Sequence, residues 1–292
     1  MRFERPGSHK IRLAIGDTGS LSEAMRRVFE PGVHFEPIPT PRSDDWLAAH
    51  DEFGQTFDQF KAEAWNKPDG ARRRIYLQPL GEFSAGRSPS QQTLKEYASV
   101  FFAVETETLP AVPVPVQAFT PRVNAKTNKR QILTTDVLSF LKENLPYDAF
   151  CVLAITMEDL YPEPLWDFVF GEASLSDRVG VCSFARYDPM FYGQLRRPDY
   201  QTLLLRRACK VLVHETAHMF GLQHCIFFNC LMNGSNHLGE SDRWPMHFCP
   251  VCLRKLQFST GSDIVQQYGK LALFYDAAGF AHEAQWMRNR LR

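Results

Sequence analysis

Hydrophobic residues from position 71 onward follow two alternating patterns. Short apolar runs predict β-strands, and apolar residues that recur at helical spacing predict α-helices. The elements predicted in this way are a strand at 74–80, a helix at 90–102, a strand at 112–119, a helix at 135–145, and strands at 148–156 and 180–186. This order predicts a three-layer α/β arrangement in which helices cover a sheet. The segment 148–156 is apolar on both faces and is placed at the centre of the sheet, whereas 180–186 has a mixed pattern and is placed at its edge.

A long helix is predicted over 200–220, followed by a less regular region. Asp199 stands in the capping position of this helix, and Gly221 is the natural residue for the left-handed turn that ends it. Residues 222–292 predict irregular loops, and helical pieces near 251–258, 262–274 and 282–291.

Prolines interrupt the first seventy residues. Those at 31, 37, 39 and 41 predict an extended linker over 31–42, because they forbid a regular helix. A helix is predicted to follow, capped by Asp44 and Asp45 and stopped by Pro68-Asp69-Gly70. We therefore divide the chain into an N-terminal extension at 1–70, an α/β subdomain at 71–221, and a mostly irregular and helical subdomain at 222–292.

The overall charge and the apolar content narrow the class of protein. The 292 residues include 33 Lys and Arg against 33 Asp and Glu, and 44% are apolar. A neutral chain has no global field for nucleic-acid phosphates or for a membrane surface, so neither partner is expected. The sequence has neither a run of 18 apolar residues nor the apolar segment of a secretory signal peptide. We expect an intracellular protein of the cytoplasm or nucleus, with its seven cysteines reduced.

Five of the nine histidines lie between positions 214 and 252, and three of them form a candidate catalytic zinc site. His214 and His218 stand one helical turn apart, which places both imidazoles on one face, able to hold one zinc ion. Glu215 beside them can accept a proton from an attacking water and later deliver it to a leaving amine. After the turn at Gly221, His224 can return as a third ligand, and the fourth position stays open, as a catalytic zinc requires. The alternative interpretation is a pair of ordinary surface histidines on an amphipathic helix.

Four of the seven cysteines lie in the same window and predict a second, structural zinc site. Cys225 and Cys230, together with the Cys-x-x-Cys pair Cys249 and Cys252, form a four-thiolate set of the kind that closed zinc sites use. The alternative is four free thiols. Because Cys225 directly follows His224, closing this site would also fix the backbone that presents the third catalytic ligand.

The string from His214 to His224 resembles the elongated zinc signature of the metzincin metallopeptidases. The four cysteines joined directly to it resemble those of the archaemetzincin family, and stretches at 155–162, 168–175 and 183–187 are similar as well. The resemblance implies a metzincin-like α/β (α+β) fold. Its upper subdomain has a mixed twisted sheet and the zinc-binding helix, and its lower subdomain holds the second zinc. It also implies that His214, His218 and His224 bind the catalytic zinc, that Glu215 is the general base, and that Met232, on pattern alone a core residue, is the methionine-turn residue.

These observations lead to a zinc-dependent metallopeptidase with two zinc ions and a peptide or protein substrate. An aminopeptidase acting on small peptides is one form of this activity, and Glu158, Asp159 and Glu172 are candidates to bind the free amine. Strand 180–186 is a candidate rail for an extended substrate. The alternatives are a catalytically silent, zinc-organised interaction module and a zinc-ribbon-like nucleic-acid binder, which the neutral charge disfavours. The oligomeric state is left open.

Overall fold

A computed structural model describes residues 3–63, 66–114 and 119–292 of the chain. The contacts divide the chain into two compact units, one formed by residues 66–220 and the other by residues 1–65 together with 221–292. The first 65 residues, which the sequence analysis treats as part of an extension, therefore pack with the C-terminal part of the chain.

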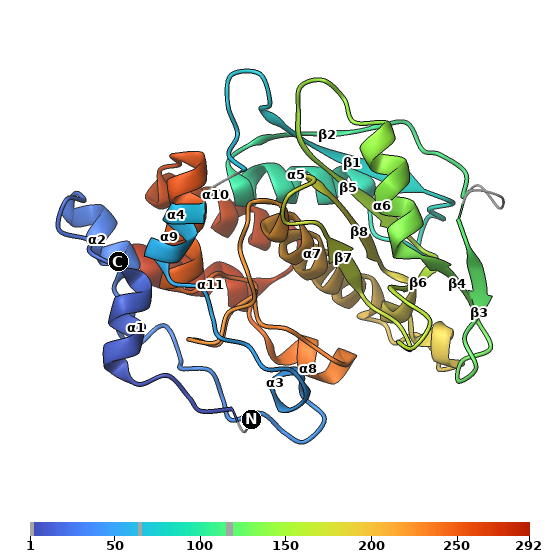
Figure 1. Cartoon of the computed structure of the whole chain (residues 1–292), viewed down its shortest axis with the longest axis horizontal. Helices are drawn as coiled ribbons and strands as arrows, with labels where there is room; N and C mark the ends of the chain where they lie inside the picture. The colour runs from blue at the N-terminus through green and yellow to red at the C-terminus, as the bar shows by residue number, and fades with distance from the viewer. Residues whose placement is uncertain (1–2, 64–65, 115–118) are drawn as a thin grey trace. The chain divides into compact units, whose positions relative to one another are not determined.

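A five-stranded sheet forms the centre of the unit 66–220. Its order is β2-β1-β5-β8-β7, and all neighbours are parallel except β7, which runs antiparallel to β8 (Figure 1). The strands are β1 (Arg74–Leu80), β2 (Glu105–Thr108), β5 (Ala149–Thr156), β7 (Gly171–Ala173) and β8 (Val179–Ser183). Every residue of β5 is buried, which confirms the central position predicted from its apolar pattern.

The edge position predicted for 180–186 is wrong. Strand β8 spans 179–183, is buried along its whole length, and lies between β5 and β7. The residues that follow it form the 3₁₀ turns η1 (Ala185–Tyr187) and η2 (Pro189–Tyr192). The sheet ends at β7 instead, a strand of three residues that includes Gly171 and Glu172 and has no strand-like hydrophobic pattern.

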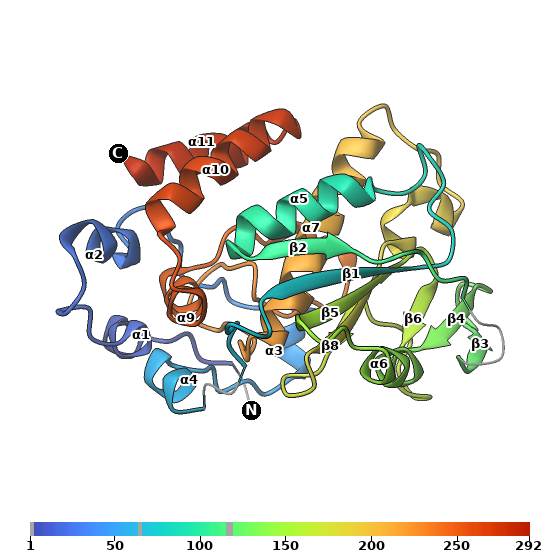
Figure 2. The same cartoon turned by 90° about the horizontal axis from the view of Figure 1, so that it is seen from above.

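Helices cover both faces of this sheet. Helix α7 (Tyr200–Met219) packs against β5, β7 and β8, and α5 (Gln91–Phe102) packs against α7 and β2. Helix α6 (Thr134–Glu143) covers the opposite face of the sheet (Figure 2). These helices confirm the predictions at 90–102, 135–145 and 200–220. Asp199 stands at the N-cap of α7, but its side chain makes no capping hydrogen bond. Gly221 has a φ of 88°, the left-handed conformation predicted for it.

A small second sheet completes this unit. It has the order β3-β4-β6 and consists of β3 (Pro121–Val123), β4 (Arg130–Leu133) and β6 (Asp159–Tyr161). Of the strand predicted at 112–119, residues 115–118 lie outside the described part of the chain, and Val112 pairs with Leu80 in an isolated parallel bridge.

The other unit is helical. Its N-terminal helices α1, α2 and α4 pack against α9, and α2 also contacts α10 (Figure 1). The helices are α1 (Ser8–Ile15), α2 (Glu23–Phe29), α3 (Trp46–Ala49), α4 (Phe57–Glu63), α8 (Leu238–Arg243), α9 (Pro250–Thr260), α10 (Ile264–Ala277) and α11 (Ala281–Leu291). The last three confirm the predicted helical pieces, whereas the single helix predicted after Asp45 is two short helices. Between these two, Gly54 has a φ of 72°, and a β-carbon there would lie 2.6 Å from Cγ1 of Ile226.

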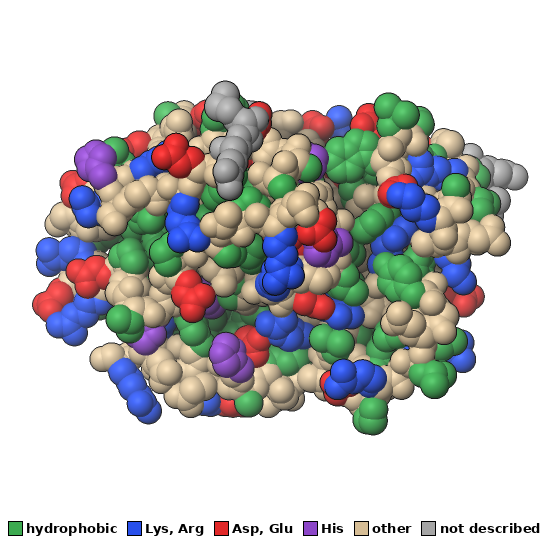
Figure 3. All heavy atoms as spheres, turned by 90° about the horizontal axis from the view of Figure 1, so that it is seen from below, with side chains coloured by type: hydrophobic (Ala, Val, Ile, Leu, Met, Phe, Trp, Pro, Cys, Tyr) green, Lys and Arg blue, Asp and Glu red, His purple; other side chains and the backbone are tan. Residues whose placement is uncertain are grey.

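The surface carries charges of both signs. On the face shown in Figure 3, Lys and Arg side chains are interspersed with Asp and Glu side chains. Within the described ranges, no helix has the length and apolar character needed to cross a membrane.

Candidate metal centre

Helix α7 presents His214 and His218 on the same face, one turn apart. Their Nε2 atoms lie 3.1 Å from each other. The two rings are nearly perpendicular, at 81°, with centroids 4.8 Å apart. Two nitrogens bound to one tetrahedral zinc ion would be separated by about 3.3 Å, given bonds of about 2.0–2.1 Å. The two imidazoles therefore already point at one position with the spacing that a shared metal needs.

His224 follows helix α7 after the turn at Gly221. Together with His214 and His218, it belongs to one of the groups of side chains that could hold a metal ion. The Nδ1 of His224 lies 2.8 Å from Oε1 of Glu52. A carboxylate that the sequence analysis missed, Glu52, therefore lies against the third predicted zinc ligand. Because 172 positions separate Glu52 from His224, no local pattern could have indicated this pair.

Glu215 lies on α7 beside the two histidines, with only 6% of its surface exposed. Burial raises the pKa of Glu215 well above its usual range, and the negative charge of Glu172 raises it further. A β-carbon at Gly171 would lie 2.5 Å from Cγ and 2.6 Å from Oε1 of Glu215. The carboxyl group therefore lies against the backbone of β7, at a position where only glycine leaves room for it. Gly171 belongs to the stretch 168–175 that resembled the family, but its steric role was not predicted.

The four clustered cysteines form a closed, buried group. Their sulfur atoms all lie within 4.8 Å of one another. The Sγ atoms of Cys225 and Cys249 are 3.6 Å apart. Two thiolates on a tetrahedral zinc ion would be separated by about 3.8 Å, given bonds of about 2.3 Å. Burial raises the pKa of the Cys230 and Cys249 thiols, whereas contacts with the other three sulfurs outweigh burial and lower the pKa of Cys225. The geometry and the donor set therefore fit a structural zinc ion.

Met232 is buried in the loop that carries two of these cysteines. Its carbonyl accepts a hydrogen bond of 2.8 Å from the backbone N–H of Cys225, and its own N–H donates to Sγ of Cys230 at 3.5 Å. The side chain of Asn233 closes the same loop. Its Oδ1 accepts from the N–H of Cys230 at 2.7 Å, and its Nδ2 donates to the carbonyl of Cys225 at 2.6 Å. The loop at 225–233 is therefore a rigid turn joined to the cysteine cluster.

A third group of possible ligands consists of Asp44, Asp45 and His237. His237 caps helix α8, since its Nδ1 accepts a hydrogen bond of 3.1 Å from the N–H of Glu240. Nδ1 therefore carries the lone pair and Nε2 carries the proton; Nε2 lies 3.4 Å from Oδ1 of Asp45 and 3.5 Å from Oδ2 of Asp44. A protonated nitrogen cannot bind a metal ion, and Asp45 is also paired with Arg243. In this arrangement the His237 cap and the Asp45–Arg243 ion pair hold the start of α8.

Several polar residues from the family-like stretches have structural partners. Asp159 is buried and accepts two hydrogen bonds from Arg186, at 2.7 and 2.8 Å. Tyr161 donates its hydroxyl hydrogen to the carbonyl of Thr120 at 3.2 Å. Of the candidates for binding an amine, Asp159 is thus engaged by an arginine, whereas Glu172 lies on the edge strand near Glu215 and accepts a hydrogen bond from Thr134.

Comparison with known proteins gives consistent matches over most of the chain. The family model described as peptidase family M54 matches residues 94–258. Human archaemetzincin-2 is 40% identical over 280 residues, covering 86% of this chain and 78% of the relative. Human archaemetzincin-1 is 35% identical over 254 residues, covering 78% of this chain and 51% of the relative.

Solved structures agree with these matches. The archaemetzincin from Methanopyrus kandleri is 32% identical with a TM-score of 0.51, covering 66% of this chain and 97% of that one. A zinc-dependent peptidase from Methanocorpusculum labreanum is 27% identical with a TM-score of 0.50, covering 62% of this chain and 99% of that one. With the family model spanning more than half of the chain, and a relative at 40% identity over most of its length, this chain belongs to the archaemetzincin family, peptidase family M54, and is a zinc metallopeptidase.

Proposed function

We propose that His214, His218 and His224 hold the catalytic zinc ion and that Glu215 is the general base. The observation that carries this proposal is the pair of Nε2 atoms 3.1 Å apart on one helix face, with the Glu215 carboxyl buried beside them. The three histidines would hold a zinc ion, which would supply Lewis-acid polarisation of the scissile carbonyl of a peptide. The substrate is a peptide or protein.

Glu215 performs the proton transfers in this proposal. Its carboxylate accepts a proton from the attacking water, and the resulting carboxylic acid delivers that proton to the leaving amine. Burial supports this role, because it keeps the carboxyl group in a fixed position beside the two histidines. Gly171 supports it as well, because the missing side chain leaves the space that the carboxyl group occupies.

A second zinc ion bound by Cys225, Cys230, Cys249 and Cys252 is the structural part of the proposal. We assign Met232 to the methionine turn, as the resemblance implies. The support is the backbone hydrogen bond of 2.8 Å between Cys225 and Met232, which joins this turn to the residue that follows His224. The division into metzincin-like upper and lower subdomains, at 71–221 and 222–292, also belongs to this proposal.

We replace 180–186 by β7 as the strand proposed to pair with an extended substrate. Because β8 is paired on both sides, an extended peptide can add only to a strand at the end of the sheet. We assign this role to β7, which carries Glu172 next to Glu215. For an aminopeptidase, Glu172 is the carboxylate that would bind the free amine of a small peptide, since Asp159 is already engaged by Arg186.

The decisive experiment is the variant Glu215→Gln, assayed on a proteome-derived peptide library. The amide has nearly the same shape but cannot accept the proton, so we expect turnover to fall about 10²–10⁴-fold with the zinc content unchanged. Glu163→Gln, at an exposed position, is the control and should cleave at the wild-type rate. Wild-type turnover in Glu215→Gln would remove this residue from its role. If the zinc-loaded wild type cleaved no peptide, the catalytically silent module would replace the proposal.

A further inference from the structure

We propose that residues 46–55, here called the N-terminal strap, position the third zinc ligand, and that Glu52 is the positioning residue. This inference rests on the proposed zinc site at His214, His218 and His224. It assigns a function to a segment that lies outside the residues matched by the family model, 94–258.

The contact with Glu52 selects the tautomer of His224. An ionised carboxylate only accepts hydrogen bonds, so the contact of 2.8 Å between Oε1 of Glu52 and Nδ1 of His224 places the ring proton on Nδ1. The lone pair is then on Nε2, where a metal ion can bind it. The carboxylate also fixes the orientation of the ring. Both side chains are about four-fifths buried, at 21% and 20% exposed, so water competes little for this contact.

Glu52 is itself held in place by Trp46. The indole Nε1 donates to the same Oε1 of Glu52 at 2.8 Å, and the indole ring meets the His224 ring edge to face, with centroids 5.1 Å apart. Trp46 has a close steric fit. A β-carbon at Gly234 would lie 2.5 Å from Cδ1 of the indole, so glycine at this position, two residues after Met232, is required for the indole to fit.

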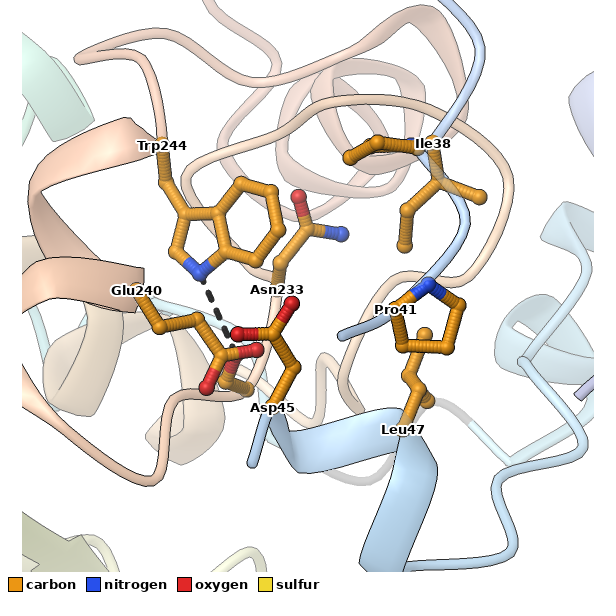
Figure 4. A pocket seen from close by; sticks show the side chains of 9 residues that line it. Ile38, Pro41, Asp45, Leu47, Asn233, Glu240 and Trp244 are labelled. Atoms are coloured by element: carbon orange, nitrogen blue, oxygen red, sulfur yellow. Dashed lines mark hydrogen bonds between the residues drawn. The ribbon is translucent and has the colours of Figure 1, made fainter. Parts of the chain in front are cut away.

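The backbone of Trp46 anchors the start of the strap. Its N–H donates to both carboxylate oxygens of Glu240, at 2.9 and 3.0 Å, and Glu240 also accepts from the N–H of Asn236 at 2.8 Å. Figure 4 shows the carboxylates of Asp45 and Glu240 on one side of the pocket that this part of the chain lines, with Leu47 on the other side. The strap is thus fixed to the segment that follows the proposed methionine turn.

The other end of the strap holds the backbone on both sides of His224. The side chain of Gln55 donates to the carbonyl of Gly221 at 3.2 Å and accepts from the N–H of Gln223 at 3.3 Å. The Nζ of Lys255, which is 1% exposed, donates to the carbonyl and to Oε1 of Gln55. The strap therefore fixes both the ring of His224, through Glu52, and the backbone that leads to it, through Gln55.

The test compares Glu52→Ala and Glu52→Gln with the wild type, using Glu36→Gln as an exposed control in the same N-terminal region. We expect Glu52→Ala to bind zinc at the three-histidine site 10–100-fold more weakly in competition with a chelator. The zinc ion bound by the four cysteines should be retained. Glu52→Gln should fall between Glu52→Ala and the wild type, because an amide oxygen still accepts from Nδ1 but carries no charge. After cobalt(II) substitution, the visible absorption bands of the three-histidine site should shift in both Glu52 variants and not in Glu36→Gln.

Two outcomes separate this inference from the proposed function. Wild-type zinc affinity and an unchanged cobalt spectrum in Glu52→Gln, together with the same result in any folded Glu52→Ala, would overturn the role of Glu52. His224→Ala serves as the reference. If it retained both equivalents of zinc at wild-type affinity, the three-histidine site itself would be refuted. If Glu52→Ala fails to fold, the affinity and spectrum of Glu52→Gln decide alone.

Discussion

Two glycines mark positions where a side chain from another element lies directly against the backbone. A β-carbon would lie 2.5 Å from Glu215 at Gly171, and 2.5 Å from Trp46 at Gly234. Real β-carbons essentially never make non-bonded contacts this short, so any larger residue must displace its neighbour. At both positions the neighbour belongs to the proposed metal centre or to its support. Each glycine therefore contributes by leaving free the volume that the neighbouring side chain occupies.

Gly171→Ala should lower peptidase activity without removing zinc. The added methyl group pushes the Glu215 carboxyl from its place, and a displacement of about 1 Å costs up to about 10²-fold in rate. Both zinc equivalents should stay, since no zinc ligand is touched. The measurement is kcat/KM together with metal content. Gly70→Ala, where nothing lies within 4 Å of the added β-carbon, is the control. Full activity in Gly171→Ala would show that the fit between β7 and Glu215 is loose.

The ion pair between Asp159 and Arg186 should be a strong determinant of stability. Both side chains are buried, and Arg186 also lies over the ring of Phe168, 3.7 Å from its centroid. Asp159→Ala leaves the guanidinium charge buried without its partner, so we expect a loss of about 3–5 kcal/mol in the free energy of unfolding. Urea denaturation measures this loss. Glu23→Ala removes the exposed pair with Arg27 and should cost less than about 1 kcal/mol. Equal losses in the two variants would contradict the argument.

Among the elements, the loop at 225–233 and helix α9 act as one unit. Helix α9 begins at Pro250, between Cys249 and Cys252, and the N–H of Cys249 donates to Sγ of Cys230 at 3.2 Å. Because Cys225 follows His224 directly, a metal ion that holds the four sulfurs also holds the backbone of the third histidine. The two proposed zinc sites are therefore coupled through one peptide bond.

Cys249→Ser should lose one equivalent of zinc and most of the peptidase activity. A hydroxyl group replaces a zinc-binding thiolate poorly, so the cluster opens and His224 loses a fixed backbone. Metal content and kcat/KM are measured on the same sample. Cys151→Ala is the matched control, because Cys151 is buried in β5, far along the chain from the cluster, and should keep both equivalents. A one-zinc Cys249→Ser protein with full activity would disprove the coupling.

For the molecule as a whole, local patterns in the sequence were informative and long-range pairings were not. Helix α7 and the buried strand β5 depend on residues close in sequence, and both were predictable. The edge strand β7 was missed because three residues with a glycine carry no periodicity, and β8 was then misplaced. Glu52 was missed because its partner, His224, lies 172 positions away.

The same reasoning predicts that residues 1–65 are required for folding. They share one compact unit with residues 221–292, and their buried aromatic residues pack on the C-terminal helices. Phe35 meets Trp286 with centroids 5.4 Å apart, and Phe57 meets Phe258 with centroids 5.6 Å apart. In addition, Arg254 on α9 donates to the carbonyls of Ile15 and Gly16, at 2.7 and 2.8 Å. Deleting residues 1–65 would leave these aromatic and polar groups without their partners.

We therefore expect the chain lacking residues 1–65 to aggregate, or to bind a dye for exposed apolar surface, and to lose peptidase activity. Such a truncation exposes apolar side chains that residues 1–65 cover, and contiguous exposed apolar surface promotes aggregation. Deleting residues 1–4 alone is the control, since it removes no residue of α1 or of the N-terminal strap, and it should leave solubility and activity unchanged. Light scattering, dye fluorescence and kcat/KM measure the difference. A soluble, active chain that begins at residue 66 would show that the C-terminal helices and the turn carrying His224 hold their structure without the N-terminal segment, and it would remove the N-terminal strap from its proposed role as well.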